Sequence, residues 1–157
     1  KIIGGLLTPD KGRIVVRDNH NEITCQAAAL QTNFCAPYQQ IIEEFTLMEM
    51  LDFHLKFRSS YGQLSKGQIL TKAGLEQHRN KKIHELSSGM KQRFKLSLAI
   101  MFESMILLLD EPLSNLDKDG IQWYQDLLND FSKNRLCIIC SNHNQDEYPF
   151  SKDFINL

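Results

Sequence analysis

The chain has 157 residues, of which 42% are hydrophobic and 24% charged, and its formal net charge at pH 7 is −1. This length and apolar content fit one globular domain with a hydrophobic core. The near-neutral charge gives no electrostatic reason to expect nucleic acid or an acidic membrane surface as the main partner. No apolar stretch approaches the roughly 20 residues of a membrane-spanning helix, and no secretory signal is visible.

The first part of the chain is expected to contain a helix end, a turn and two strands. Residues 1–7 are typical of the last turn of a helix, which a Gly-Gly pair terminates because glycine ends helices at little cost. Residues 9–12, Pro-Asp-Lys-Gly, are a turn signal. Residues 13–17 and 30–35 are rich enough in apolar residues to be candidate strands.

Capping residues and apolar spacing predict helices in the middle and second half. Thr46 and Glu49 form a capping box at the start of one helix, since each can bond a free backbone N–H there. A polar helical segment is expected over residues 68–77. Residues 88–103 and 118–133 place apolar side chains at helical spacing and predict two further helices.

Two stretches of the second half are wholly apolar and predict buried strands. Residues 105–109 and 136–140 show no polar alternation, so both are expected to be buried on two faces, as in a parallel sheet. Residues 154–157 are a candidate for a short last strand. Helices that alternate with buried strands predict an α/β fold with a largely parallel sheet.

The cysteines are expected to be buried, reduced thiols. Cys137 and Cys140 are three residues apart within a predicted strand and therefore point to opposite faces, which argues against a shared metal ion. The other two cysteines are Cys25 and Cys35. Free thiols of this kind are typical of a protein of the cytosol.

Polar motifs follow one another along the second half. In chain order they are Leu86-Ser87-Ser88-Gly89-Met90, Ile106 to Pro112, Ser114-Asn115-Leu116-Asp117, and His143. The first lies at a predicted helix start, the second and the last at the ends of predicted strands. Each therefore lies where an α/β fold can present side chains to a ligand.

The Ser-Ser-Gly sequence suits an anion. A helix N-terminus offers free N–H groups and a partial positive charge of roughly half a unit. Ser87 and Ser88 add hydroxyl groups, and Gly89 allows backbone to approach a ligand closely. The alternative is that Ser87 is an ordinary N-cap residue.

Asp110 and Glu111 end a buried strand side by side. Adjacent strand residues diverge, so one carboxylate can face a magnesium ion while the other orients or deprotonates a water molecule. The alternative is a pair of solvated acids, although the following Pro112 favours a fixed loop. His143 taken alone is more often structural, but beside these acids it can hydrogen-bond a terminal phosphate.

In order and spacing these motifs resemble the ATP-binding cassette (ABC) family of transporter ATPases. Residues 86–93 are similar to the signature that begins LSGGQ, with Met90 in place of the usual glutamine. Residues 106–111 resemble its Walker B motif, residues 114–117 its D-loop SxLD, and His143 its switch histidine. The resemblance covers nearly the whole chain.

The resemblance implies a P-loop NTPase core with an inserted helical subdomain. Residues 1–157 would be a partial ABC ATPase domain, with the helical subdomain at approximately residues 46–103. Such domains pair head to tail as a homodimer or pseudo-dimer with ATP and Mg²⁺ between them.

The resemblance also implies a role for each candidate residue. Asp110 would hold the magnesium ion and Glu111 would polarise the attacking water. His143 would contact the γ-phosphate of the same nucleotide. The residues implied to contact the partner's nucleotide or to connect the two sites are Ser87, Ser88, Gly89 and Asp117.

Two features depart from the family pattern. No G-x-x-x-x-G-K-[ST] occurs, although residues 2–12 look like the segment just after that phosphate loop. The simpler explanation is that the sequence is truncated, and the alternative is a degenerate cassette. In both cases we expect these residues to bind ATP weakly and to form a sheet with an unpaired central edge. The identity of the family's Q-loop glutamine is also undecided. In an alignment without gaps Pro37 stands at its position, so Gln39 or Gln40 is a candidate only if the loop is shorter here.

The function that these features predict is ATP hydrolysis coupled to a membrane permease. The resemblance implies a cytoplasmic ATPase subunit, peripheral to the inner face of the cell membrane, that docks on an integral membrane permease and binds no nucleic acid. Glu43-Glu44-Phe45 is a candidate contact, or else a solvated acidic turn. The alternatives are a soluble ABC-type ATPase acting on ribosomes or in cofactor assembly, and a non-catalytic cassette module.

Overall fold

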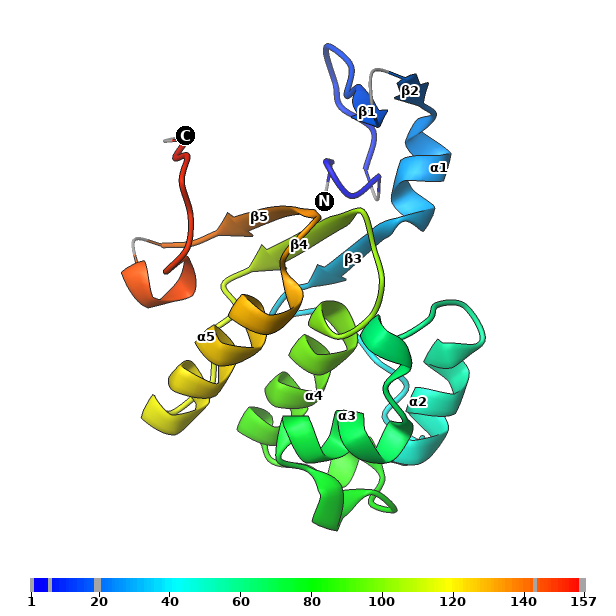
Figure 1. The fold of residues 1–157 in the computed structure, drawn as a ribbon, viewed down its shortest axis with the longest axis vertical. Coiled ribbons are helices and arrows are strands. Elements are labelled where there is room, and N and C mark those ends of the chain that lie inside the picture. The colour runs from blue at the N-terminus through cyan, green and yellow to red at the C-terminus, as the bar shows by residue number, and fades with distance from the viewer. Residues whose placement is uncertain (1, 6, 19–20, 143, 156–157) are drawn as a thin grey trace.

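The computed structural model describes residues 2–5, 7–18, 21–142 and 144–155 (Figure 1). Its strands are β1 (Val16–Asp18), β2 (Asn21–Ile23), β3 (Thr32–Cys35), β4 (Ile106–Asp110) and β5 (Leu136–Cys140). Its α-helices are α1 (Cys25–Leu30), α2 (Leu47–Leu55), α3 (Lys66–Ala73), α4 (Ser88–Ile100) and α5 (Lys118–Phe131). Short 3₁₀ helices are η1 (Tyr61–Gln63), η2 (Glu76–His78), η3 (Ile83–Glu85) and η4 (Gln145–Glu147).

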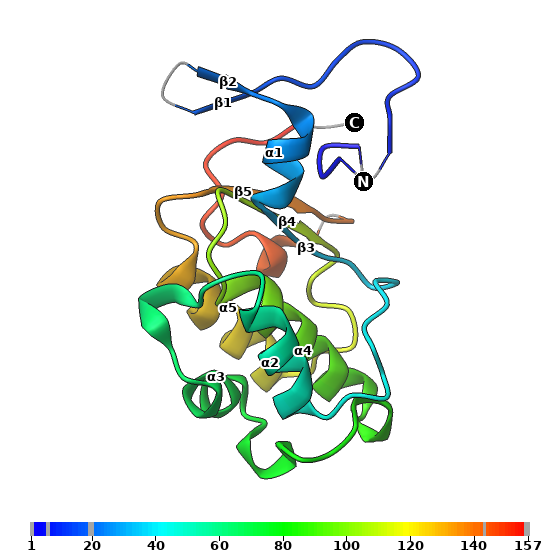
Figure 2. The same cartoon turned by 90° about the vertical axis from the view of Figure 1, so that its right-hand side faces the viewer.

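A parallel sheet of order β3-β4-β5 forms the centre of the molecule, which confirms the predicted α/β fold. Its register places Phe34 beside Leu108 and Leu108 beside Ile138. Figures 1 and 2 show the sheet between the β1–β2 hairpin with α1 on one side and the remaining helices on the other. The carboxyl ends of the three strands therefore meet at one edge, where a ligand site is expected.

The edge strand β5 differs from the sequence expectation. The first four residues of β4 are buried, as predicted for residues 105–109, but β5 is only half-buried and Leu136 at its start is 57% exposed. The expectation of full burial was wrong for β5 because it lies at the edge of the sheet in the described residues. In the described residues β3 and β5 each pair only with β4, so the sheet has unpaired edges, as expected where the strand before a phosphate loop is missing.

The N-terminal segment precedes the sheet as a turn, a hairpin and a short helix. The Gly5 N–H donates to the Ile2 carbonyl at 3.0 Å, with Gly5 at a φ of 71°. The predicted strand at 13–17 is shorter and later, because β1 begins at Val16 and pairs antiparallel with β2. Helix α1, capped by Thr24, was not predicted from the sequence.

The helical part between β3 and β4 follows its capping signals. Thr46 and Glu49 form the predicted capping box of α2, and their side chains and N–H groups bond reciprocally. Ser65 and Gln68 form a second capping box, which starts α3 before the predicted position. Helix α3 then ends at Gly74, whose φ of 71° is a left-handed conformation that glycine adopts without strain.

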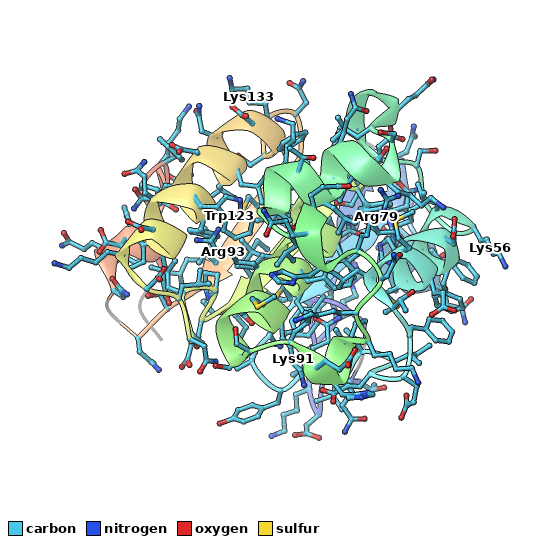
Figure 3. The ribbon with its side chains drawn as sticks, turned by 90° about the horizontal axis from the view of Figure 1, so that it is seen from below. Lys56, Arg79, Lys91, Arg93, Trp123 and Lys133 are labelled. Atoms are coloured by element: carbon cyan, nitrogen blue, oxygen red, sulfur yellow. The ribbon has the colours of Figure 1, made fainter. Side chains whose placement is uncertain are left out.

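Three helices meet around Trp123. Figure 3 shows Arg93 of α4 beside Trp123 of α5, and the guanidinium carbon is 5.1 Å from the ring centre. The Trp123 indole N–H also donates to the Lys72 carbonyl in α3 at 2.6 Å. These contacts join the helical part to the helix that covers the sheet.

The core lies between the sheet and helices α2 to α5. Its largest fully buried side chains are Tyr124, Phe94, Phe102, Leu47, Leu51, Ile69, Leu70, Leu75, Ile83, Leu96, Ile100 and Met101. Helix α4 contributes to it on most of its surface and runs through the middle of the cluster. Within the described residues, no helix combines the length and apolar character needed to cross a membrane.

Two smaller expectations are only partly met. Cys35 is buried as predicted, and burial raises the pKa of its thiol to about 12, whereas Cys137 is half-buried and Cys140 is exposed. Phe154 and Ile155 lie outside any strand, and residues 156–157 fall outside the described residues. The described residues therefore form no last strand.

Candidate functional site

The carboxyl end of β4 carries the two adjacent acids that the sequence singled out. Asp110 is the last residue of β4, lies in register with Cys140 of β5 and is half-buried. Among the described residues the structure records no hydrogen bond to the Asp110 carboxylate. Its hard oxygen atoms are thus available to a cation or to water.

Glu111 leaves the strand in a left-handed conformation with a φ of 43°. This conformation is costly for a residue with a side chain and persists only where the surroundings impose it. The Glu111 N–H donates to the Cys140 carbonyl at 2.9 Å, and its carboxylate accepts a hydrogen bond from the Asn142 side-chain amide. Both the backbone and the side chain of Glu111 are therefore attached to the end of β5.

The loop after Glu111 is fixed by its own turns and by α4. The Ser114 N–H donates to the Glu111 carbonyl at 3.1 Å, and Asn115 adopts a φ of 64°. Gln92 of α4, only 2% exposed, donates its side-chain amide to the Pro112 carbonyl at 2.9 Å. The loop between the acids and α5 is consequently ordered, as Pro112 suggested.

Asp117 has a visible structural role. It is the N-cap residue of α5, and its carboxylate accepts from the Gly120 N–H at 2.8 Å. The side chain is nevertheless exposed on its outer side. The hydrogen bond to the Gly120 N–H uses one of the two carboxylate oxygens of Asp117. The contact of Asp117 with a second nucleotide site stays a prediction.

Ser87, Ser88 and Gly89 begin α4. The Ser87 hydroxyl accepts from the Met90 N–H at 3.3 Å, so the ordinary capping role is present. Ser88 is exposed, and a Cβ on Gly89 would lie 3.0 Å from the Asn115 carbonyl oxygen. A side chain here would force the Asn115 backbone to shift by a few tenths of an ångström, because the start of this 13-residue helix packs closely on the loop that leads to Asp117.

The segment after β3 holds Gln39 and Gln40, and both are exposed. Lys95 of α4 donates to the carbonyls of Ala36 and Pro37 at 3.3 and 3.0 Å, which fixes the first part of this segment. Sequence reasoning missed Lys95 because its partners are distant along the chain. Both glutamines remain candidate ligand contacts.

The segment after β5 holds two further groups that the sequence did not reveal. One is Asn142, whose only sequence signal is its place before His143, and His143 itself lies outside the described residues. The other is Glu147 of η4, which is 5% exposed. Burial raises the pKa of Glu147, the Ser141 hydroxyl and the Leu113 N–H lower it, and the charges of Glu111 and Asp110 raise it.

A magnesium ion fits the chemistry of this edge. Within the described residues no three His, Cys, Asp or Glu side chains come together. Mg²⁺ commonly keeps several waters and takes one or two carboxylates together with phosphate oxygens. The open carboxylate of Asp110 meets that requirement.

The ABC transporter family model matches residues 1–114 of this chain. Among similar proteins, an ABC transporter ATP-binding protein of Bacillus subtilis, YybJ, is 30% identical over 94% of this chain and 67% of its own length. The human retinal-specific phospholipid-transporting ATPase ABCA4 is 28% identical over 99% of this chain, which spans 7% of that protein. The spermidine/putrescine import ATP-binding protein PotA of Mycoplasma mycoides is 32% identical over 74% of this chain and 34% of its own length.

Solved structures show the same fold. An ABC transporter ATP-binding protein from Pyrococcus furiosus matches with a TM-score of 0.71 at 20% identity, over 91% of this chain and 70% of that one. The ATP-binding subunit of an ABC transporter matches with a TM-score of 0.73 at 22% identity, over 90% of this chain and 61% of that one.

Proposed function

This chain belongs to the ABC transporter family, and we propose that residues 1–157 are part of the ATP-hydrolysing domain of a transporter ATPase. The observation that carries the proposal is the pair of acids at the end of β4, with Asp110 open and Glu111 fixed by Asn142. Residues 1–157 contain no glycine-rich phosphate loop, so the proposed activity belongs to a protein in which such a loop accompanies them.

Glu111 is the proposed general base. Its carboxylate accepts a proton from the attacking water, whose oxygen forms a bond to the γ-phosphorus. The bond from that phosphorus to the β–γ bridging oxygen breaks, which yields ADP and phosphate. Asp110 is the proposed ligand of Mg²⁺, which neutralises charge on the phosphates when bound. His143 is the proposed contact of the γ-phosphate, and Gln39 or Gln40 the proposed Q-loop contact.

The start of α4 is the proposed contact to a nucleotide held by a second domain. Ser88 is exposed there, and the N-terminal N–H groups and dipole of a 13-residue helix favour an anion. The proposed assembly is a head-to-tail pair, in which Ser87, Ser88 and Gly89 face the partner's ATP. Asp117, exposed at the start of α5, is the proposed link between the two sites.

A permease is the proposed membrane partner of the helical part, residues 46–103. Phe45, Phe53 and Phe57 form a chain of edge-to-face rings with centroids 6.1 and 5.1 Å apart, and Phe57 is 72% exposed. A cavity of about 230 Å³ lies beside them, lined by Phe45, Glu49, Asp52, Phe53 and Lys56. Figure 3 shows Lys56 projecting from this edge of the molecule. Exposed aromatic groups are common at protein interfaces, which supports docking at the inner face of the cell membrane.

Replacement of the proposed base tests the function. In the full-length protein, Glu111→Gln should lower magnesium-dependent ATP hydrolysis by about 10²–10⁴-fold, the loss typical of a general base. ATP binding should persist because the amide keeps the shape of the side chain. Phosphate release and nucleotide binding are measured on the same preparation.

Two controls frame this test. Asp130→Asn, at an exposed position late in α5, should leave the rate unchanged. Residues 1–157 alone should release no phosphate, since no backbone loop and lysine hold the β- and γ-phosphates. An unchanged rate in Glu111→Gln, or robust hydrolysis by residues 1–157, contradicts the proposal.

A further inference from the structure

We propose that Asn142 and Glu147 are positioning residues that set the orientation of the Glu111 carboxylate. Asn142 acts by direct contact, and Glu147 by holding together the two loops that carry Asn142 and Glu111. The inference rests on the proposed function, because it concerns how the proposed base is held.

The Asn142 side-chain amide donates to one carboxylate oxygen of Glu111, Oε1. The Glu111 N–H is bonded to the Cys140 carbonyl, two residues before Asn142. Backbone and side chain of Glu111 are therefore held by the same short stretch at the end of β5. With Oε1 occupied, Oε2 is the oxygen left for a water molecule.

The loop that carries Asn142 is itself held in place. The Asn144 N–H donates to the Ser141 hydroxyl at 3.1 Å, which closes a tight turn around Asn142. Helix α5 fixes the far end of this loop, because the Tyr124 hydroxyl donates to the Glu147 carbonyl at 2.7 Å. The Gln125 side-chain amide adds a second bond, to the Asp146 carbonyl, at 3.1 Å.

The Glu147 side chain lies between the two loops. It is 5% exposed, and its neighbours include the Ser141 hydroxyl on one loop and the Leu113 N–H on the other. One of its carboxylate oxygens, Oε2, has no hydrogen-bond partner among the residues that the structure describes. Burying a carboxyl group costs free energy unless polar groups around it compensate. The Glu147 carboxyl lies where the turn after Glu111 meets the turn around Asn142.

Loss of Asn142 should free the Glu111 side chain to rotate without disturbing the phosphate contacts. The rate of the chemical step depends on that orientation, whereas ATP affinity depends on other residues. In the full-length protein, Asn142→Ala should lower kcat about tenfold while KM for ATP changes less than about twofold. Asn142→Asp should lower kcat further, because it places a like charge beside Glu111.

A double-mutant cycle separates positioning from a general structural effect. If Asn142 acts through Glu111, adding Asn142→Ala to Glu111→Ala should not lower the residual rate further. The matched control is Asn129→Ala, an exposed asparagine on α5. An equal loss in both backgrounds, or a KM that rises together with the loss in kcat, overturns the role of Asn142.

The role of Glu147 is tested by conservative rescue. A glutamine keeps the length and shape of the side chain that lies near the Ser141 hydroxyl and the Leu113 N–H, so Glu147→Gln should keep kcat within about threefold. Glu147→Ala, in contrast, should lose about as much as Asn142→Ala. The two losses should not add, because both variants free the same carboxylate. Additive losses, or a full loss in Glu147→Gln, overturn this part of the proposal.

The contact itself can be measured without ATP. In the full-length protein without nucleotide, Glu111→Ala should shift the side-chain amide resonance of Asn142 in an NMR spectrum, and Asp130→Ala should not. If the chemical shift of the Asn142 side-chain amide is the same in Glu111→Ala as in the wild type, the contact is refuted. In the full-length protein, absence of hydrolysis refutes the proposed function, whereas hydrolysis that depends on Glu111 but not on Asn142 refutes only the positioning role.

Discussion

At the scale of single residues, His54 is a largely buried imidazole whose surroundings disfavour its protonated, positively charged form. It lies in the last turn of α2 with its ring centre 4.5 Å from that of Phe102. Its Nε2 is buried and has no hydrogen-bond partner within the described part of the chain. Burial, with a smaller contribution from the positive charge of Arg58, lowers the pKa of His54 to about 4.

This environment predicts a loss of stability in acid. The unfolded chain takes up a proton at His54 near the ordinary pKa of about 6.5, whereas the folded chain does so only near 4. The free energy of unfolding should therefore be unaffected by His54 above pH 6.5 and fall as the pH drops to 4, by at most about 3 kcal/mol.

Urea unfolding of the chain at about pH 7 and about pH 5, on either side of the ordinary histidine pKa, measures this effect. His54→Leu keeps an apolar contact with Phe102 and should remove most of the difference between the two pH values. His84→Gln, at an exposed histidine, is the control and should leave the difference intact. A wild-type difference that survives His54→Leu would assign the acid sensitivity to other groups.

Residue roles were predictable from the sequence where the partner is local. Thr46 and Glu49 were found because a capping box lies within one turn. The structure gives Asp117 a capping role beside its predicted one. Asn142 escaped notice because its acceptor, Glu111, is 31 residues away in sequence and close only in the folded chain.

At the scale of elements, the end of α4 shows how distant side chains complete a helix. The last carbonyls of a helix lack partners within it. Asn33 of β3 donates its amide to the carbonyls of Ala99 and Phe102 at 2.9 and 2.8 Å. Arg135, just before β5, donates to the Ile100 carbonyl at 2.6 Å. A residue of β3 and the residue just before β5 thus hold the helix that presents the signature sequence at its other end.

Replacement of Asn33 should be strongly destabilising. Asn33 is 5% exposed, and Asn33→Leu keeps its size but leaves two buried carbonyls without this donor. We expect a loss of about 1–3 kcal/mol in the free energy of unfolding, the cost of one unsatisfied group, because the Phe102 carbonyl still accepts from Arg135 at 3.3 Å whereas the Ala99 carbonyl loses its donor. Chemical denaturation measures it, with Asn129→Leu as an exposed control. A loss below about 0.5 kcal/mol would mean that water or Arg135 replaces the amide.

The starts of three helices were predicted better than the burial of the strands, for a physical reason. Capping residues and apolar spacing are local signals that lie within the sequence of each helix. Helices α2, α4 and α5 accordingly begin at or within one residue of the predicted starts. Strand burial depends on neighbours that are distant in sequence. Similar apolar runs therefore gave a buried central strand, β4, and a half-exposed edge strand, β5.

At the scale of the whole molecule, motif order predicted the fold class but not the strand pairing. The missing phosphate-loop motif predicts an unpaired edge in the sheet, and in the described residues β5 pairs only with β4. In the structure β5 pairs with β4 along five positions, from Ile106 with Leu136 to Asp110 with Cys140. Unpaired backbone groups are costly, so β4 takes the parallel partner that the chain provides. That pairing also brings Asn142 to Glu111.

The aromatic rings on and beside α2 carry the last prediction, which concerns the assembly around the chain. If the patch of Phe45, Phe53 and Phe57 docks on a permease, Phe57→Ser in the full-length protein should weaken capture of an integral membrane protein from detergent-solubilised membranes about tenfold or more, as loss of an aromatic anchor does. Folding should be unaffected because Phe57 is 72% exposed. Phe154→Ser, at a ring that is 66% exposed outside the patch, is the matched control and should keep the membrane partner. Equal capture by both variants argues against docking through these rings, and recovery of ribosomes instead favours a soluble ABC-type ATPase. Since neither ring belongs to the proposed catalytic edge, the outcome bears on the partner independently of ATP hydrolysis.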